Sequence, residues 1–186
     1  MAAGDKAVLL SIRPWWVSMI ATGKKTVEVR KTRPKLDVPF KCYLYMTKER
    51  GKIEVPVMKP GGHGLVSQGK IMGEFICDGI KQFDVPFPAY WNEVCEVCKP
   101  TLDAACLTYG EAHNYLGHRT GYAWHINQLQ MYKHPVHLFN FKLWHGCINC
   151  KQKGTYHCLR HCKGRFIERA PMSWCYVEEI DVEPYK

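Results

Sequence analysis

The sequence predicts a mixed α+β protein in which most elements are short strands that form a partly closed β-barrel. Two observations lead to this expectation. The chain begins with the order strand, helix, strand, and its later segments read mainly as short strands. A doubly wound sheet would instead need strands and helices to alternate along the whole chain. We therefore expect five to seven short strands and at least two small helices.

The amino-terminal part of the chain reads as a strand followed directly by a helix. Residues 7–12, AVLLSI, are a short apolar run typical of a buried strand. The next segment, PWWVSMIATG, begins with Pro14, which suits the first position of a helix. It ends with Gly23, which suits the residue just past a helix end. We therefore expect a helix between these two residues.

The pattern of residues 26–30, TVEVR, changes to a period of two. Val27 and Val29 fall on one side, and Glu28 and Arg30 fall on the other. This predicts a strand whose valines are buried and whose two charged residues share the opposite face. Strands with one face in water are common, so an ordinary solvated strand face is the simpler interpretation.

The rest of the chain reads mainly as short strands separated by irregular segments. Residues 69–83 predict one long strand in which Gly73 and Gly79 mark bulge or bend points. Residues 48–68 contain several glycines and prolines, and we expect them to form a long loop. The other expected elements are strands over 42–47, 122–127, 136–141 and 173–180 and a helix over 106–117.

The composition is that of an ordinary globular chain with an excess of positive charge. The 186 residues carry a formal net charge of +9, and residues 1–60 contain 13 Lys and Arg against five Asp and Glu. A basic surface suits a polyanionic partner such as nucleic acid, although it can equally serve only solubility. No apolar run approaches the roughly 20 residues of a membrane span or forms a signal peptide. We expect a cytoplasmic protein without a membrane segment.

A charged cluster surrounds the strand at residues 26–30. Glu28 and Arg30 are two residues apart, so they share a face and are close enough to pair. Lys25 lies on the preceding turn, from which its ammonium can reach the same face. The cluster would combine a guanidinium fork, an acceptor and a mobile cation on one short segment. Such a cluster suits a ligand or substrate, and it is the alternative to the solvated strand face.

The residues in this region resemble a known family. The order strand, helix, Gly23-x-Lys25-x-x-Glu28-x-Arg30 is similar to the ASCH domain, whose G-x-K-x-x-E-x-R signature follows its first helix. The later segments GKIMGEF and GYAWHI also resemble family elements, and the resemblance covers residues 7–142. It implies a PUA-like β-barrel with a cleft beside the signature strand.

ASCH and PUA-like domains are associated with RNA, modified bases and coactivator proteins, so the resemblance implies an RNA or nucleotide ligand. Some ASCH proteins are amidohydrolases that act on acylated cytidine, and others are ribonucleases. The amidohydrolases pair the signature lysine, here Lys25, with a threonine at the position that Glu28 holds here. A carboxylate does not replace a hydroxyl, so this departure counts against the same chemistry. If the chain is an enzyme, Lys25 and Glu28 are its expected catalytic residues.

Residues at the corner between the first strand and the helix complete the expected ligand site. An aromatic ring beside arginines can stack an exposed base, as in the recognition of single-stranded RNA. One of the two adjacent tryptophans can equally belong to the core. The expected ligand-binding residues are Ser11, Arg13, Trp15, Trp16, Lys25, Glu28 and Arg30.

The carboxy-terminal part of the chain is rich in cysteine. Two close pairs with the spacings C-x2-C and C-x3-C predict a closed structural zinc site, because we do not expect disulfides in a reducing compartment. An unliganded, reduced tail is the alternative. The expected zinc ligands are Cys147, Cys150, Cys158 and Cys162, and His157 or His161 can replace a cysteine of the second pair. The separate pair Cys95 and Cys98 has no obvious partner pair, and Cys42, Cys77, Cys106 and Cys175 are expected in the core.

These features divide the chain into two parts. We expect an ASCH domain over residues 1–143 and a Cys-rich, zinc-binding extension over residues 144–186, which returns a last strand to the barrel. Three functions stay open. The leading one is a binding module for RNA or a modified nucleotide, and DNA is a possible ligand as well. The second is a small hydrolase that uses Lys25 and Glu28, and the third is a protein–protein adaptor that uses the aromatic segment FDVPFPAYW.

Overall fold

The computed structural model describes residues 5–49, 68–86, 96–117, 119–144 and 166–182, and the structural statements below refer to these residues. No helix in this part of the chain is long and apolar enough to cross a membrane. The elements in chain order are β1 (Lys6–Ile12), α1 (Pro14–Ala21), β2 (Val27–Arg30), β3 (Phe40–Met46), β4 (Lys70–Cys77), β5 (Ile80–Phe83), α2 (Lys99–Ala104), α3 (Tyr109–Leu116), β6 (Gly121–His125), β7 (Asn127–His137), a 3-10 turn (Leu138–Asn140) and β8 (Trp174–Glu178).

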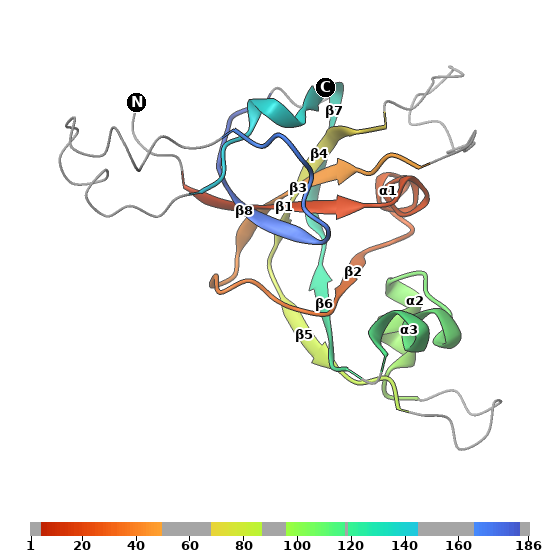
Figure 1. The fold of residues 1–186 in the computed structure, drawn as a ribbon. Coiled ribbons are helices and arrows are strands. Elements are labelled where there is room, and N and C mark those ends of the chain that lie inside the picture. Colours follow the sequence, from red (N-terminus) through yellow and green to blue (C-terminus); the bar gives the residue numbers. More distant parts are fainter. Residues whose placement is uncertain (1–4, 50–67, 87–95, 118, 145–165, 183–186) are drawn as a thin grey trace.

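The described strands form two sheets (Figure 1). Sheet A has the order β7-β4-β3-β1-β8, and sheet B has the order β2-β6-β5. β1 and β3 run parallel, and all other pairs are antiparallel. The described chain passes four times between the sheets, from β1 to β2, from β2 to β3, from β4 to β5 and from β6 to β7. Among the described residues no pairing joins the edges of the two sheets, so the expected partly closed barrel is wrong, while the α+β class with few helices is confirmed.

The start of the chain folds as its sequence predicts. β1 is buried almost throughout, and α1 begins at Pro14. Gly23 has a φ of +72°, a left-handed conformation that is unstrained for glycine. The chain can therefore leave α1 in a tight turn and enter β2, which carries the charged signature residues.

Three apolar clusters hold the layers together. The largest lies between the two sheets, where the inner face of sheet A and helix α1 pack around Trp124 of β6. The second covers the outer face of sheet A, where Phe141 and Ile167 pack on it. The third lies between sheet B and the helices α2 and α3 and includes Val29 and Leu116. Sheet B thus lies between two apolar layers.

Residues 69–83 form the two strands β4 and β5 instead of one, because the chain bends at Asp78 and Gly79 and enters the other sheet. The Asp78 carboxylate joins this bend to the segment where β6 ends and β7 begins, which also crosses from one sheet to the other. It accepts a hydrogen bond from Asn127 Nδ2 at 2.7 Å and lies 2.5 Å from Nδ1 of His125. The expected bend at Gly79 is confirmed, and the single long strand is wrong.

Two further elements differ from the expectation. The strand expected over 136–141 is wrong, since residues 127–137 form the long strand β7 and a 3-10 turn follows it. β7 is an edge strand with many exposed positions and contains Pro135, so it lacks the apolar pattern of a central strand. The short helix α2, over 99–104, was not expected, because six residues are too few to show a helical period.

The carboxy-terminal strand β8 completes sheet A. It pairs antiparallel with β1, so that Cys175 lies opposite Leu9. Residues 145–165, which contain the four expected zinc ligands, lie outside the described residues. The Cys-rich lobe therefore stays a prediction.

Candidate functional site

Both faces of strand β2 are buried. Val29 packs against the helices α2 and α3, and Val27 is half-buried beside it. Glu28 and Arg30 lie on the other face, as expected, and Glu28 lies opposite Trp124 at the layer between the sheets. Glu28 and Arg30 are only 7% and 6% exposed. The interpretation of this stretch as a solvated strand face is therefore wrong.

Glu28 lies at the centre of a buried ionic triad with Lys25 and Arg30, which we call the triad. Its Oε1 lies 3.0 Å from Nη2 of Arg30, and its Oε2 lies 3.3 Å from Nζ of Lys25. Lys25 is 3% exposed, so all three charged side chains are removed from water. Buried charges are tolerated when they are paired and hydrogen-bonded. Two cations and one carboxylate leave the triad with a formal charge of +1.

The turn after α1 places the Lys25 ammonium against the triad. The Lys25 backbone N–H donates to the backbone oxygen of Met19 at 3.0 Å, which fixes the turn. Its Nζ donates to the backbone oxygen of Ala105 at 2.7 Å, just after α2. The Nζ also lies 5.1 Å from the ring centre of Trp16, within the range of a cation–π interaction. Lys25 thus ties α1, β2 and α2 together.

The Arg30 guanidinium is held by its Nη atoms and not by its Nε atom. Nη2 donates to the backbone oxygen of Ser11 at 2.8 Å, and Nη1 donates to the Ser173 hydroxyl over a long 3.4 Å. Nε is buried and has no hydrogen-bond partner in the described part of the chain. A guanidinium has five N–H donors, so this one keeps donor capacity for a further acceptor.

Tyr115 of α3 links the buried triad to the surface. Its side chain is 39% exposed. Burial raises the pKa of its hydroxyl, and the nearby Arg30 guanidinium partly opposes this by its charge and by a side-chain hydrogen bond to Tyr115. On the same ring, Nζ of Lys31 lies 5.0 Å from the ring centre. An aromatic side chain and an exposed cation therefore stand beside the guanidinium on the side of α3.

The other expected ligand residues have different positions. Ser11 is buried, and its hydroxyl donates to a backbone oxygen before β8, so it contacts the triad through its own backbone oxygen. Trp15 is 49% exposed. The Arg13 side chain is largely exposed and forms a long ion pair with Glu49 at 3.9 Å. Ser11 and Trp16 are thus brought to the triad, whereas Arg13 forms its ion pair elsewhere. The cleft expected beside these residues stays a prediction.

A shallow hollow of about 430 Å³ lies on the other face of sheet B. Its walls are mainly apolar and come from β2, β5, β6 and α2, with Val27, Ile80 and Ala123 among them. Because Val27 and Glu28 point to opposite faces of β2, this hollow and the triad are separated by the strand.

No group of three or more metal-ligating side chains occurs in the described ranges. Of the expected zinc ligands none lies within these ranges. Cys98 is buried, and its partner in the pair, Cys95, is not described. Cys42 and Cys77 are buried as expected, while Cys106 and Cys175 are partly exposed.

A family model matches the part of the chain that contains the triad. The family model of the ASCH domain matches residues 10–141, which is more than two thirds of the chain. The chain belongs to the ASCH domain family. The match begins within β1, ends after β7 and contains the whole triad, whereas β8 lies outside it. No match is found among curated proteins.

Crystal structures of an ASCH protein from Zymomonas mobilis resemble this ASCH domain in fold. One is 21% identical with a TM-score of 0.50 and covers 71% of this chain and 73% of that chain. A tyrosine-to-phenylalanine mutant is 20% identical with a TM-score of 0.50 and covers 72% and 77%. A serine-to-alanine mutant is 17% identical with a TM-score of 0.56 and covers 94% and 89%. These similarities support a PUA-like fold and, at such low identity, concern the fold alone.

Three contacts of the triad could not be found from the sequence. The backbone oxygen of Ala105, the hydroxyl of Ser173 and the ring of Tyr115 all come from distant segments. Ala105 is 80 residues from Lys25 along the chain, and Ser173 is 143 residues from Arg30. No local sequence pattern predicts contacts between residues so far apart. Of the three, only Tyr115 lies in an element that the sequence predicted, the helix expected over 106–117.

Proposed function

We propose that this ASCH domain binds RNA, or a modified nucleotide within RNA, at the triad. The observation that carries the proposal is the Arg30 guanidinium, which is buried and keeps an unpaired Nε–H. A buried donor without a partner is costly, and an acceptor that joins it when a ligand binds would remove this cost. Phosphate oxygens and base carbonyls are acceptors that suit a guanidinium.

The charge and the surroundings of the triad favour such a ligand. Its formal charge of +1 attracts an anion, and burial strengthens each contact because few waters screen it. The weakest Arg30 contact, to Ser173, leads to the segment before β8, and Tyr115 stands on the side of α3. We infer that a ligand reaches Arg30 between these two residues. The Tyr115 ring can then stack on a base.

Glu28 has the wrong charge for phosphate. Its carboxylate holds Arg30 and Lys25 in position and is 3.0 Å and 3.3 Å from their nitrogen atoms. It serves as an orienting group, and an amino group of a base is the one ligand group that could donate to it. Lys25 is similarly engaged by Glu28 and Ala105, so Arg30 is the residue most available to the ligand.

The test compares two arginine variants in a titration with short single-stranded RNA. Arg30→Lys keeps the charge that balances Glu28 and removes the guanidinium fork with its Nε–H. A lost charge-assisted hydrogen bond costs about 1.5–3 kcal/mol, so we expect affinity to fall at least about tenfold. Arg169→Lys is the matched control, because Arg169 is exposed and makes no contact with the triad among the described residues. If folded Arg30→Lys binds like Arg169→Lys at low and at moderate salt, the triad is not the RNA site.

The same proteins distinguish binding from hydrolysis. Wild-type protein is incubated with acylated cytidine and with labelled RNA, and the products are separated. Binding without turnover is the expected result. Turnover that disappears in a folded Lys25→Gln variant would instead assign the hydrolase function to Lys25 and Glu28.

A further inference from the structure

A ladder of aromatic side chains runs along β8. The ring centres of Trp144 and Tyr176 are 6.4 Å apart, and those of Tyr176 and Trp174 are 5.3 Å apart. Trp174 in turn lies 6.0 Å from the buried Trp124. The first three rings are half-buried, so the ladder leads from the surface into the layer between the sheets. Trp144, Tyr176 and Trp174 meet edge to face, at interplanar angles of 67° and 70°, so the parts of their faces that reach the surface can contact flat ligand groups.

A lysine is fixed on the same rings. Nζ of Lys6 lies 3.7 Å from the ring centre of Tyr176 and 4.0 Å from that of Trp144. Cation–π contacts on two rings restrict the ammonium to one position, and partial burial lowers the pKa of Lys6. The ammonium is therefore prearranged for an anionic group. Glu178 lies opposite Lys6 in the β1–β8 register.

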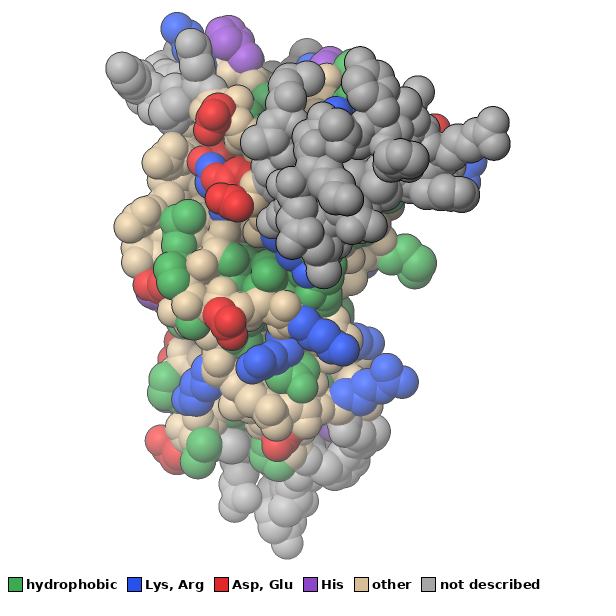
Figure 2. Space-filling view, turned by 90° about the vertical axis from the view of Figure 1, so that its left-hand side faces the viewer, with side chains coloured by type: hydrophobic (Ala, Val, Ile, Leu, Met, Phe, Trp, Pro, Cys, Tyr) green, Lys and Arg blue, Asp and Glu red, His purple; other side chains and the backbone are tan. Residues whose placement is uncertain are grey.

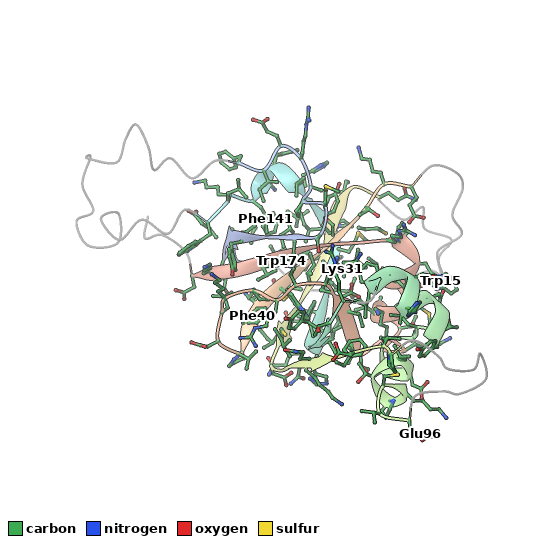
Figure 3. All side chains as sticks on the ribbon, turned by 60° about the horizontal axis from the view of Figure 1, so that its bottom comes forward. Trp15, Lys31, Phe40, Glu96, Phe141 and Trp174 are labelled. Carbon is green, nitrogen blue, oxygen red and sulfur yellow. The ribbon has the colours of Figure 1, made fainter. Side chains whose placement is uncertain are left out.

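A basic loop is fastened to this ladder. Nε1 of Trp174 donates to Thr32 Oγ1 at 3.0 Å, and the backbone N–H of Lys35 donates to the Tyr176 hydroxyl at 2.6 Å. These bonds hold the loop after β2 against β8, and in Figure 3 Trp174 and Lys31 lie near one another at the centre. The exposed cations of the loop are Lys31, Arg33 and Lys35.

We name the set of Lys6, Lys31, Arg33, Lys35, Trp144, Trp174 and Tyr176 the β8 strip. The strip joins the triad, because Ser173, which contacts Arg30, directly precedes Trp174. Figure 2 faces the start of β1 and shows Lys and Arg side chains gathered among apolar ones, below a separate acidic group. The acidic neighbours Asp5, Asp37 and Glu178 offset part of the positive charge. The rings must therefore supply much of any binding energy.

We propose that the β8 strip binds the single-stranded RNA that flanks the nucleotide held at the triad. This inference rests on the proposed function, and it specifies the ligand as an extended single strand instead of a free nucleotide. Bases stack on the aromatic rings, and phosphates contact Lys6 and the basic loop. Stacking tolerates any base, so the strip adds affinity without adding sequence preference. A duplex hides its base faces and binds the strip poorly.

The first test varies the length of the ligand. Wild-type protein is titrated with a mononucleotide, with a single-stranded RNA of about eight nucleotides and with the same RNA in a duplex. The single strand is expected to bind at least about tenfold more tightly than the mononucleotide and the duplex. Equal affinities for the mononucleotide and the single strand would overturn the proposal.

The second test changes the strip itself. Trp144→Ala and Lys6→Gln should each weaken binding of the single strand by about tenfold and leave mononucleotide binding unchanged, whereas Trp144→Phe should retain most of the affinity. Phe139→Ala and Lys133→Gln are matched controls, because both residues are exposed and lie outside the strip. If Trp144→Ala and Lys6→Gln bind the single strand as tightly as these controls do, the proposal that the β8 strip binds RNA is wrong.

The two proposals can fail separately. If Arg30→Lys binds RNA normally while Trp144→Ala and Lys6→Gln do not, RNA does not bind at the triad, and the proposal that it binds along the β8 strip is supported. If Arg30→Lys weakens binding and the strip variants do not, the triad is supported and the strip is overturned. Thermal unfolding of each variant shows whether lost affinity comes from lost folding. If wild-type protein binds a peptide or protein ligand at the strip in place of RNA, both are overturned.

Discussion

Glu28 and Arg30 face the interior of the molecule from adjacent positions on one side of β2, with 3.0 Å between Oε1 and Nη2. Two charged residues in alternate strand positions usually face water. Here the face lies against the layer between the two sheets, and Lys25 adds a second cation to the same carboxylate. In this chain the signature residues thus form a buried ionic cluster that holds α1, β2 and the segment after α2 together. A ligand site built on it would be rigid.

Removing the carboxylate should destabilise the protein strongly. Glu28→Gln leaves the buried Lys25 and Arg30 without their counter-charge, so we expect a loss of about 3–5 kcal/mol in the free energy of unfolding. Glu168→Gln, at an exposed position, should change it by less than about 0.5 kcal/mol. Urea denaturation of both variants measures the difference. Equal midpoints for the two variants would show that the triad does not stabilise the fold.

The start of α3 should show a pH dependence. Glu111 accepts hydrogen bonds from the backbone N–H and the hydroxyl of Thr108, each at 2.8 Å, and these bonds lower the pKa of its carboxyl. A carboxyl whose pKa is lowered by folding stabilises the fold above its usual pKa of about 4.5 and loses this effect as the pH falls below it. Wild-type protein should therefore be more stable than Glu111→Gln at pH 7, and the difference should shrink between pH 5 and pH 3. A difference that does not change with pH would contradict the role of the capping box.

Replacing Gly73 or Gly110 by alanine should change the free energy of unfolding in opposite directions. A Cβ on Gly73 would lie 2.4 Å from the backbone oxygen of Gln130, where β4 meets β7 at a register shift, so Gly73→Ala must displace backbone. We expect a loss of about 1–3 kcal/mol in the free energy of unfolding. Gly110 in α3 has open space around its Cβ position, so Gly110→Ala should stabilise by about 0.5–1 kcal/mol. The same sign for both variants in chemical denaturation would contradict the close approach of β4 and β7.

Zinc binding by the carboxy-terminal cysteines stays a prediction. We expect one equivalent of zinc, bound by Cys147, Cys150, Cys158 and Cys162 at thiolate–metal distances of about 2.3 Å. Metal analysis of freshly purified protein should find it, and Cys158→Ser should lower it while the isolated Cys106→Ser should not. Removal of the zinc with a chelator should loosen the structure of residues 144–170 and leave the two sheets folded. Less than half an equivalent of zinc in wild-type protein contradicts the prediction.

The sequence predicted local relationships better than distant ones. The spacing of two residues placed Glu28 and Arg30 on one face, and Gly23 marked the end of α1, since both depend on neighbouring residues alone. The burial of the triad was not predicted, because it depends on the layer between the sheets and on partners such as Ala105, 80 residues from Lys25. The two sheets were mistaken for a partly closed barrel for the same reason. The bend at Gly79, which sends the chain into the second sheet, leaves no periodic pattern in the sequence.

The most direct test of the account observes the unpaired Nε–H of Arg30 itself. In ¹⁵N-labelled protein the arginine Nε–H resonances are assigned by comparing wild type with Arg30→Lys and Arg33→Lys, and single-stranded RNA is then added. If Arg30 binds the ligand, its Nε–H resonance shifts and exchanges more slowly with water as RNA saturates the protein, in parallel with the affinity measured by titration. If RNA binds while the Arg30 Nε–H resonance and its exchange rate stay unchanged, the triad is a structural cluster and the RNA site lies elsewhere.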